Sequence, residues 1–290
     1  MITIFTPAYN RAHTLGKLYE SLKRQSSHNF EWLVIDDGSK DGTQELFKTW
    51  LEQRNPFKIT YIKTENGGKH KAINLGVSKA GGEAFFIVDS DDFLPSDSVE
   101  KIEKAFSSVV DNERFAGICG LRADPSDKKP FANSAASAGL DCSMADIRYK
   151  YHIRGDMAEV FKTSVLRQYP FPVFEGEKFM NEAVVWGEIA KKHLMRYTGD
   201  ILYYCEYMPD GLTRSIRRQY RRSPKGTKLY YGRLIKDKSI PLKERAKAGV
   251  LYWRYLCFNG EGYKNMPLFL VIFWPAGVFF YFMDCFRGVR

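Results

Sequence analysis

Short apolar runs alternate with longer amphipathic stretches over the first 120 residues of the chain. The apolar runs are rich in β-branched and aromatic residues and are typical of strands, whereas the stretches between them carry apolar residues at helical spacing. The pattern predicts strands at residues 2–6, 32–35, 57–62, 84–88 and 115–121, and helices at residues 14–25, 43–54, 69–79 and 96–110.

This order of elements predicts an α/β fold, a Rossmann-type mixed and mostly parallel sheet flanked by helices on both faces. In open sheets of this kind, ligands bind beyond the carboxyl ends of the strands. Asp36 and Asp37 follow the second predicted strand, and the acidic run at residues 89–92 follows the fourth. We therefore expect these side chains to share one ligand-binding edge of the sheet.

The periodicity weakens in the second part of the chain. Residues 122–151 are rich in Ala, Ser, Asp and Lys and predict an irregular segment. Beyond it we expect strands at residues 157–162 and 201–204, with a helix at residues 182–193 between them. The predicted organisation is a domain over residues 1–213, with halves at 1–120 and 121–213, followed by a helical extension over 214–290.

Positive charge is concentrated near the C-terminus. The 290 residues carry a net charge of +10, yet through Thr213 there are 27 basic and 30 acidic residues. From Arg214 onward there are 17 basic and 4 acidic residues. This asymmetry indicates an anionic partner for the extension, such as membrane lipid, nucleic acid or a phosphorylated acceptor, and a solvated basic surface is the alternative.

Two stretches of the extension favour a membrane among these partners. Residues 214–247 interleave basic with apolar and aromatic side chains, as helices that lie on anionic bilayers do. Because no nucleic-acid-binding motif accompanies the charge, we predict no nucleic acid partner. Residues 266–283 contain no charged side chain, and an 18-residue helix spans about 27 Å, the lower limit for crossing a bilayer.

The prolines at positions 267 and 275 argue against a straight span through the bilayer. We expect a shallow insertion or a re-entrant hairpin; a full span and a helix packed against the body remain the alternatives. The five cysteines show no C-x-x-C spacing, which argues against a disulfide framework or a zinc site. Without a recognisable secretory leader, the sequence predicts a cytoplasmic body at the inner face of the membrane.

The acidic run at residues 89–92 carries the most distinctive chemistry. Asp89, Asp91 and Asp92 place three carboxylates within four residues, and their mutual repulsion has no use in folding alone. A divalent cation removes this conflict, since Mg²⁺ and Mn²⁺ prefer oxygen ligands and bridge carboxylates to substrate phosphates. The alternative is an acidic N-cap for the helix that begins near Ser96.

Three further motifs stand in order around the acidic run: Thr-Pro-Ala-Tyr-Asn-Arg at residues 6–11, Asp-Asp-Gly-Ser at 36–39 and Asn-Gly-Gly at 66–68. Together they resemble glycosyltransferase family 2, strongly over about residues 1–120 and more weakly over 150–213. The resemblance implies a GT-A fold with a nucleotide-binding and an acceptor half. It also implies inverting hexosyl or N-acetylhexosaminyl transfer from a nucleoside-diphosphate sugar, by expectation a UDP-sugar.

The resemblance also assigns roles to individual positions. Asp37, or its neighbour Asp36, would accept the N3–H of uracil, while Asp91 would bind Mn²⁺ or Mg²⁺ directly. Asp89 would lie near the ribose and the metal, and Lys69 with His70 would approach the donor phosphates, unless these two merely begin a solvated helix. The remaining nucleotide-pocket positions are Pro7, Ala8, Tyr9 and Arg11, with the Tyr9 ring suited to stack on a base.

Family members carry an acidic pair before a helix, and its second acid takes the proton from the attacking hydroxyl. The matching position is Glu182, preceded by Asn181 where an acid is common. Glu177 is the reserve candidate, and a helix-dipole role for Glu182 is the alternative.

The basic, apolar extension suggests that the carbohydrate acceptor is a lipid-linked or cell-surface polysaccharide precursor. Two other classes remain open, a sugar nucleotidyltransferase and a binder of nucleotide sugars without catalysis. The first would release pyrophosphate in place of a nucleoside diphosphate, and the second would not cleave the donor.

Overall fold

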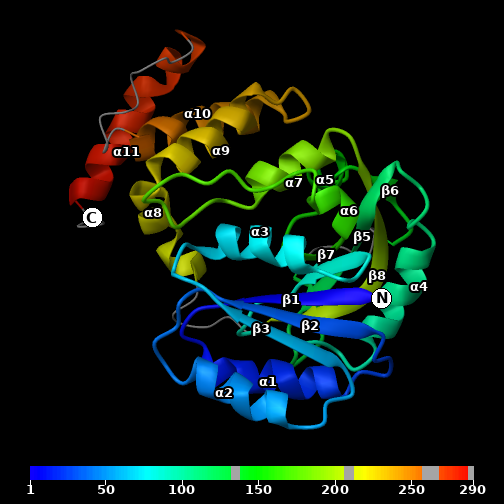
Figure 1. Cartoon of the computed structure of the whole chain (residues 1–290). Helices are drawn as coiled ribbons and strands as arrows, with labels where there is room; N and C mark the ends of the chain where they lie inside the picture. The colour runs from blue at the N-terminus through cyan, green and yellow to red at the C-terminus, as the bar shows by residue number, and fades with distance from the viewer. Residues whose placement is uncertain (132–137, 206–211, 257–267, 287–290) are drawn as a thin grey trace. The chain divides into compact units, whose positions relative to one another are not determined.

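The computed structural model describes residues 1–131, 138–205, 212–256 and 268–286. Its strands form one eight-stranded sheet in the order β3-β2-β1-β4-β7-β5-β8-β6 (Figure 1). The strands are β1 (Ile2–Ala8), β2 (Phe30–Asp36), β3 (Lys58–Lys63), β4 (Ala84–Ile87), β5 (Phe115–Ala123), β6 (Asp141–Cys142), β7 (Met157–Lys162) and β8 (Leu194–Tyr204).

The helices connect these strands and make up most of the chain beyond β8. They are α1 (Ala12–Lys23), α2 (Thr43–Glu52), α3 (Lys69–Lys79), α4 (Ser98–Ser107), α5 (Met144–Tyr149), α6 (Thr163–Leu166), α7 (Ala183–Ala190), α8 (Leu212–Arg222), α9 (Pro224–Lys236), α10 (Leu242–Leu256), the 3₁₀ helix η2 (Leu268–Phe273) and α11 (Trp274–Phe286).

The sheet confirms the predicted mixed, mostly parallel α/β architecture. β1 pairs in parallel with β2 on one side and with β4 on the other, and β3 extends the parallel part. β7 runs antiparallel between β4 and β5, and β6 is antiparallel to β8. All seven residues of β2 are buried, as expected for a strand covered on both faces.

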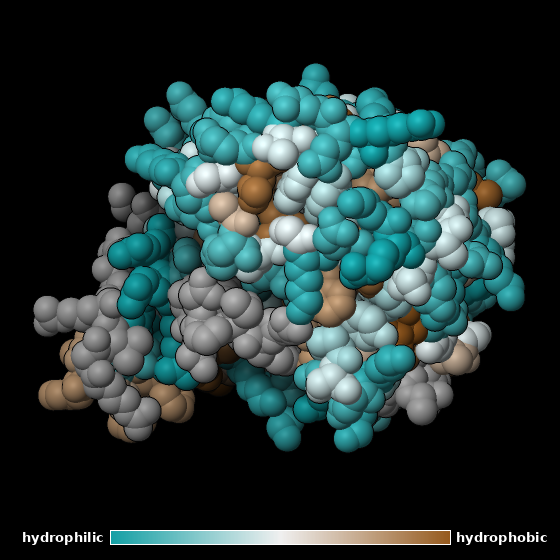
Figure 2. Space-filling view, turned by 90° about the horizontal axis from the view of Figure 1, so that it is seen from below, coloured by the Kyte–Doolittle hydropathy of each residue, from teal (hydrophilic) through white to brown (hydrophobic). Residues whose placement is uncertain are grey.

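Helices α1, α2 and α4 pack on one face of the sheet, and α3 covers the other (Figure 1). Alternation along β1 places Ile2 and Ile4 in the core under α1, whereas Phe5 faces α3. A Cβ on Gly76 of α3 would lie 2.2 Å from the Phe5 ring, so only glycine permits this approach. Figure 2 views the α1–α2 layer from outside, where exposed side chains are mostly hydrophilic.

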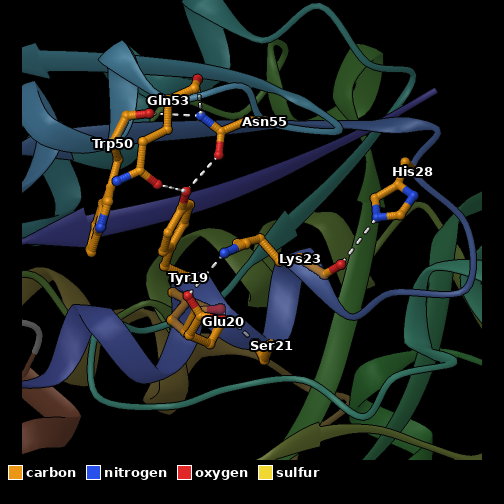
Figure 3. Close-up of polar contacts among 9 residues, drawn as sticks. Tyr19, Glu20, Ser21, Lys23, His28, Trp50, Gln53 and Asn55 are labelled. Carbon is orange, nitrogen blue, oxygen red and sulfur yellow. Dashed lines mark hydrogen bonds and ion pairs between the residues drawn. The ribbon is translucent and has the colours of Figure 1, made fainter.

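Tyr19 fixes α1 to the end of α2 (Figure 3). Its ring stacks on Trp50 at a centroid distance of 4.4 Å, and its hydroxyl donates to Asn55 Oδ1 at 2.6 Å. Asn55 in turn donates from Nδ2 to the Trp50 carbonyl at 2.7 Å. Buried aromatic contact and satisfied polar groups together hold α1 in one place on the sheet.

The second part of the chain differs in detail from the sequence prediction. β8 begins at Leu194, seven residues before the predicted strand, and pairs with β5 through several register shifts. β6 and α5 lie within the stretch predicted to be irregular. β6 has only two residues and forms by antiparallel pairing with β8, which local sequence does not reveal. α5 has six residues and is capped by Ser143, whose side chain accepts from the Asp146 amide.

The chain divides into two compact units, 1–170 with 187–208 and 171–186 with 209–290. The sequence predicted a boundary at residue 213, whereas here residues 171–186 group with the C-terminal helices. The first unit holds the whole sheet. The second has its own core, in which Tyr220, Tyr231 and Trp253 are buried.

Asp284 of α11, in the second unit, is 1 % exposed, and two arginine side chains form ion pairs with it. Arg254 donates to both of its carboxylate oxygens, at 2.8 and 2.6 Å, and Arg221 Nη2 lies 2.7 Å from Oδ2. Burial of a carboxylate without such partners would be costly. The ion pairs therefore tie α8, α10 and α11 together.

The apolar segment predicted at residues 266–283 begins outside the described residues and continues as η2 and α11. Over the described part of the chain, no helix combines the length and apolar character that a membrane span requires. Several large side chains of η2 and α11 are nevertheless exposed: Ile272, Trp274, Phe279, Phe282 and Phe286.

Candidate active site

The loops after β1, β2 and β4 lie at the carboxyl edge of the sheet and hold most of the residues predicted to contact the nucleotide and the metal. The Asp37 amide donates to the Ala8 carbonyl at 2.8 Å, which joins the first two loops. Asn10 has a φ of 54° and accepts from the Lys40 amide through Oδ1 at 2.8 Å. The motifs at residues 6–11 and 36–39 therefore form one structure.

The carboxylates of Asp36 and Asp37 hold this edge together. Asp37 accepts from the amides of Gly67 and Gly68 at 2.6 and 2.8 Å and from Asn66 Nδ2 at 3.1 Å. Asp36 accepts from the Ser39 amide at 2.7 Å and from the Tyr61 hydroxyl.

Both carboxylates thus accept hydrogen bonds from the protein itself. The sequence did not indicate this structural role. The Asn-Gly-Gly motif is explained by it, since Gly68 has a φ of 97° and offers its amide at the start of α3. A contact of either carboxylate with uracil stays a prediction.

The predicted nucleotide-pocket residues of the first loop differ in exposure. Ala8 is buried and Pro7 half-buried at the end of β1, while the Tyr9 ring is 46 % exposed. An exposed aromatic ring beside a rigid backbone turn offers a surface on which a base can stack. Arg11 lies close enough to the acidic run for its positive charge to oppose the effect of burial, which by itself raises the pKa values of Asp89 and Asp91.

Lys69, the first residue of α3, forms an ion pair with Asp89, with Nζ 2.6 Å from Oδ1. Burial alone would raise the Asp89 pKa, but the positive charges of Lys69 and Arg122 hold it below its usual value. His70 is buried, and burial with the nearby Lys71 charge lowers its pKa to about 4. At neutral pH it therefore contributes no positive charge toward a phosphate.

The other two carboxylates of the acidic run behave in the opposite way. Burial and the negative charge of Asp89 raise the pKa of Asp91, and the same two causes raise that of Asp92 to about 7. The pKa shifts of these carboxylates therefore differ in direction, downward for Asp89 and upward for Asp91 and Asp92, as expected where like charges share a small volume.

A hydrogen-bond network that the sequence did not indicate fixes the acidic run at residues 89–92, which we now call the acidic turn. Tyr203 of β8, which is fully buried, donates to Asp92 Oδ2 at 2.8 Å and accepts from the Asp89 amide at 2.8 Å. The Arg122 guanidinium lies over the Tyr203 ring at 4.2 Å, and its Nε donates to the Met157 carbonyl at 2.7 Å. Since Tyr203 is 111 positions from Asp92, no local motif could have revealed the contact.

The raised pKa of Asp92 predicts a pH dependence of the stability of the metal-free protein. In the unfolded chain this carboxyl titrates near its ordinary value of about 4. The folded state therefore binds the extra proton between about pH 4 and pH 7, so this residue costs stability as pH rises through that window. We expect Asp92→Asn to remove up to about 3 kcal/mol of this loss, as urea titrations with EDTA at pH 5 and pH 8 would measure. An unchanged difference between the two pH values would contradict the assignment.

The residues of the acidic turn fit a divalent cation. Asp91 is half-buried beside Asp89, and a cation there would relieve the repulsion that raises its pKa. Over the residues that the structure describes, no three His, Cys, Asp or Glu side chains gather into a group that could hold a metal alone. A cation held by one or two carboxylates takes its other ligands from phosphate and water, as Mg²⁺ commonly does.

Glu182 belongs to the second unit and directly precedes α7. Its neighbour Asn181 accepts from the Ala183 amide at 2.9 Å and donates to the Tyr220 hydroxyl at 2.7 Å, so it caps the helix. Glu177 is 6 % exposed and accepts from the amides of Lys225 and Gly226 at 2.7 and 2.8 Å. The reserve candidate thus holds the start of α9, which sequence reasoning did not anticipate.

Sequence comparisons agree with this geometry. The profile described as glycosyl transferase family 2 matches residues 3–157, which is more than half of the chain. Glycosyltransferase GlyA of Streptococcus pneumoniae serotype 4 is 37 % identical over 103 residues, 36 % of this chain and 14 % of that protein. Glycosyltransferase GlyG of the same organism is 32 % identical over 117 residues, 39 % of this chain and 38 % of that protein. The chain thus spans well under half the length of either relative.

Solved structures share the fold at low sequence identity. S. aureus TarS residues 1–349 in complex with UDP-GlcNAc has a TM-score of 0.59 and 16 % identity, covering 95 % of this chain and 79 % of that one. Mannosyltransferase PcManGT from Pyrobaculum calidifontis, in complex with GDP-Man and Mn²⁺, has a TM-score of 0.59 and 18 % identity, covering 99 % and 82 %. The fold is that of GT-A glycosyltransferases, as the resemblance implied.

Proposed function

Because the chain belongs to glycosyl transferase family 2, we propose that it transfers a hexosyl or N-acetylhexosaminyl residue from a UDP-sugar to an acceptor hydroxyl. Inversion at the anomeric carbon is part of the proposal. The observation that carries it is the acidic turn at the carboxyl edge of the sheet, where Asp89 and Asp91 lie beside Lys69 and Arg11. The carboxylates would hold the metal, and the nearby positive charges would contact the diphosphate that the metal binds.

In this mechanism the Tyr9 ring and the loop around Asp37 receive the nucleotide. Asp91, with Asp89, would hold Mn²⁺ or Mg²⁺, which when bound stabilises the negative charge of the departing diphosphate. Lys69 can exchange its ion pair with Asp89 for a donor phosphate oxygen. Glu182 would accept the proton of the acceptor hydroxyl as its oxygen bonds to the anomeric carbon and the bond to the diphosphate breaks.

A screen of nucleotide sugars tests this function. The full chain is incubated with each donor and Mn²⁺ or Mg²⁺, and the release of nucleoside diphosphate and of pyrophosphate is measured separately. Slow, metal-dependent release of nucleoside diphosphate into water is the expected result. Pyrophosphate release would instead indicate a nucleotidyltransferase, and binding without cleavage of any donor would indicate a non-catalytic binder.

The second unit supports a further part of the proposal, that the acceptor is a lipid-linked or cell-surface polysaccharide precursor at the inner leaflet. α11 exposes 61 % of Phe279 and 53 % of Phe282, in an extension that carries 17 basic and 4 acidic residues from Arg214 onward. Exposed aromatic side chains together with positive charge are characteristic of surfaces that insert shallowly into anionic bilayers.

We expect Phe279→Ser with Phe282→Ser to weaken binding to vesicles that contain phosphatidylserine by about tenfold or more, because two aromatic rings no longer leave water. Co-sedimentation of the full chain with vesicles measures the effect. Leu51→Ser is the matched control, since Leu51 is 49 % exposed on α2. No effect of the double substitution would refute membrane docking by this face, and equal binding to neutral phosphatidylcholine vesicles would show that the positive charge does not contribute to it.

A further inference from the structure

A cavity of about 830 Å³ opens in the first unit between α1, α4 and the end of β8. Its wall includes Lys17 of α1, Arg24 directly after that helix, Lys101 of α4 and Lys128, together with the aromatic residues Phe93 and Tyr204; we call it the basic pocket. The volume lies within the range of sites that enclose small molecules or chain segments.

The basic pocket concentrates positive charge in a part of the chain that is otherwise balanced. Among the described residues that line it, four are basic and one, Asp97, is acidic. Asp97 is engaged by Lys101, with Nζ 2.8 Å from Oδ2. Through Thr213 the chain has 27 basic and 30 acidic residues, so four cations around one cavity are a local feature. Such a wall attracts an anion.

The walls of the basic pocket are fixed by hydrogen bonds to α1. Gln25, at the end of α1, donates from Nε2 to the Pro95 carbonyl at 2.7 Å and accepts from the Val99 amide at 3.0 Å. The Leu94 amide donates to Ser21 Oγ at 3.2 Å. The Lys17 ammonium lies 4.2 Å from the Phe93 ring centroid, a cation–π contact that holds it at the wall. Because the residues of this wall are already held in place, less conformational entropy is lost when an anion binds to it.

The position of the basic pocket connects it with the acidic turn. Phe93 directly follows Asp92 in the sequence, and it pairs with Tyr204 through two backbone hydrogen bonds of 3.2 and 2.9 Å. The two rings lie 5.4 Å apart, so they form an apolar, aromatic surface at this end of the cavity. From there the pocket continues past Lys17 of α1 to Arg24, which directly follows the helix.

The basic pocket is separate from the predicted donor site. Its described lining includes none of the positions assigned to the nucleotide or the metal, namely Pro7, Ala8, Tyr9, Arg11, Asp36, Asp37, Lys69, Asp89 and Asp91. An anion that occupies it is therefore not the donor diphosphate. What the cavity offers is cations for phosphate groups and an aromatic surface for sugar rings, both next to the acidic turn.

We propose that the basic pocket binds a phosphate-bearing segment of the acceptor glycan, extending from the acidic turn along α1. The proposal rests on the proposed function, because it names a substrate class for the same reaction. It adds that the acceptor carries negative charge beyond the hydroxyl that reacts, and that Lys17 and Arg24 select for this charge.

Binding of fluorescein-labelled linear inorganic polyphosphate to the full chain, followed by fluorescence anisotropy, tests the proposal. EDTA removes divalent cations, and saturating UDP occupies the donor site. We expect Lys17→Glu with Arg24→Glu to raise the Kd about tenfold or more, since two ion pairs become repulsive contacts. Lys17→Ala with Arg24→Ala, a milder change on the same exposed positions, should raise it by a smaller factor.

Two charge-matched controls locate the effect. Lys48→Glu with Lys104→Glu changes exposed lysines of α2 and α4 in the same unit, outside the pocket lining. Lys228→Glu with Lys236→Glu makes the same change in the basic second unit. The first pair should leave the Kd within about twofold of the wild type at moderate salt, where exposed charges are screened. The second pair measures any separate binding of polyphosphate to the basic extension.

A Kd that rises equally in the control variants would overturn the proposal, as would an unchanged Kd in the folded Lys17/Arg24 variants. Single-stranded DNA that binds as tightly, with the same dependence on Lys17 and Arg24, would assign the pocket to nucleic acid instead. The donor screen on the wild-type chain reports on the proposed function independently, because polyphosphate binding requires no turnover.

Discussion

Asp91→Asn is expected to abolish the metal dependence of donor cleavage and to lower kcat by at least about a thousandfold, since a metal that stabilises the leaving diphosphate contributes several kcal/mol. The amide keeps the size of the side chain but removes the charge that opposes the cation. Asp91 is half-buried beside Asp89, and a bound cation would relieve the repulsion that raises its pKa.

The measurement is release of nucleoside diphosphate as Mn²⁺ is titrated, together with Mn²⁺ binding followed by electron paramagnetic resonance. Asp111→Asn is the control, because Asp111 is an exposed acid away from the acidic turn. If the Asp91 variant bound Mn²⁺ as tightly as the wild type, the metal would have to lie elsewhere and the proposed mechanism would fail.

Glu182→Gln is expected to lower kcat for transfer to an acceptor by about 10² to 10⁴, the usual contribution of a positioned general base. The donor KM should stay within a few-fold of the wild type, because this residue is proposed to act on the acceptor hydroxyl alone. The loss should shrink when the acceptor hydroxyl is replaced by a nucleophile that needs no base.

Two glutamates near Glu182 serve as matched comparisons. Glu188→Gln, on the helix that Glu182 precedes and paired with Lys191 at 2.7 Å, should change kcat little. Glu177→Gln should instead lower stability by about 1 to 2 kcal/mol, because its carboxylate accepts two backbone amides at the start of α9. A kcat loss confined to the Glu177 variant, with Glu182→Gln close to wild type, would show that the base is not Glu182.

The order of elements up to β5 could be predicted because it depends on local patterns. The helix predicted at residues 69–79 coincides with α3, and the other elements up to β5 differ from their predictions by a few residues at their ends. Beyond β5, the strand predicted at residues 157–162 coincides with β7. Buried parallel strands are continuous apolar runs, and amphipathic helices repeat at a fixed period, so neither requires knowledge of distant residues. The acidic turn was recognisable for the same reason, since like charges seldom cluster without a partner.

The sequence alone thus determined the α/β class, the sheet edge at which the predicted nucleotide and metal residues lie, and the carboxylates at 89, 91 and 92. The tertiary structure decided how these groups are held: Asp37 by the amides of residues 67 and 68, and Asp92 by Tyr203. It also decided that Glu177 anchors α9 and that Lys17 and Lys128 share a cavity. These contacts join residues from about 30 to more than 100 positions apart. Their pairing follows from how sheet and helices pack, and packing is a property of the whole chain rather than of any local segment.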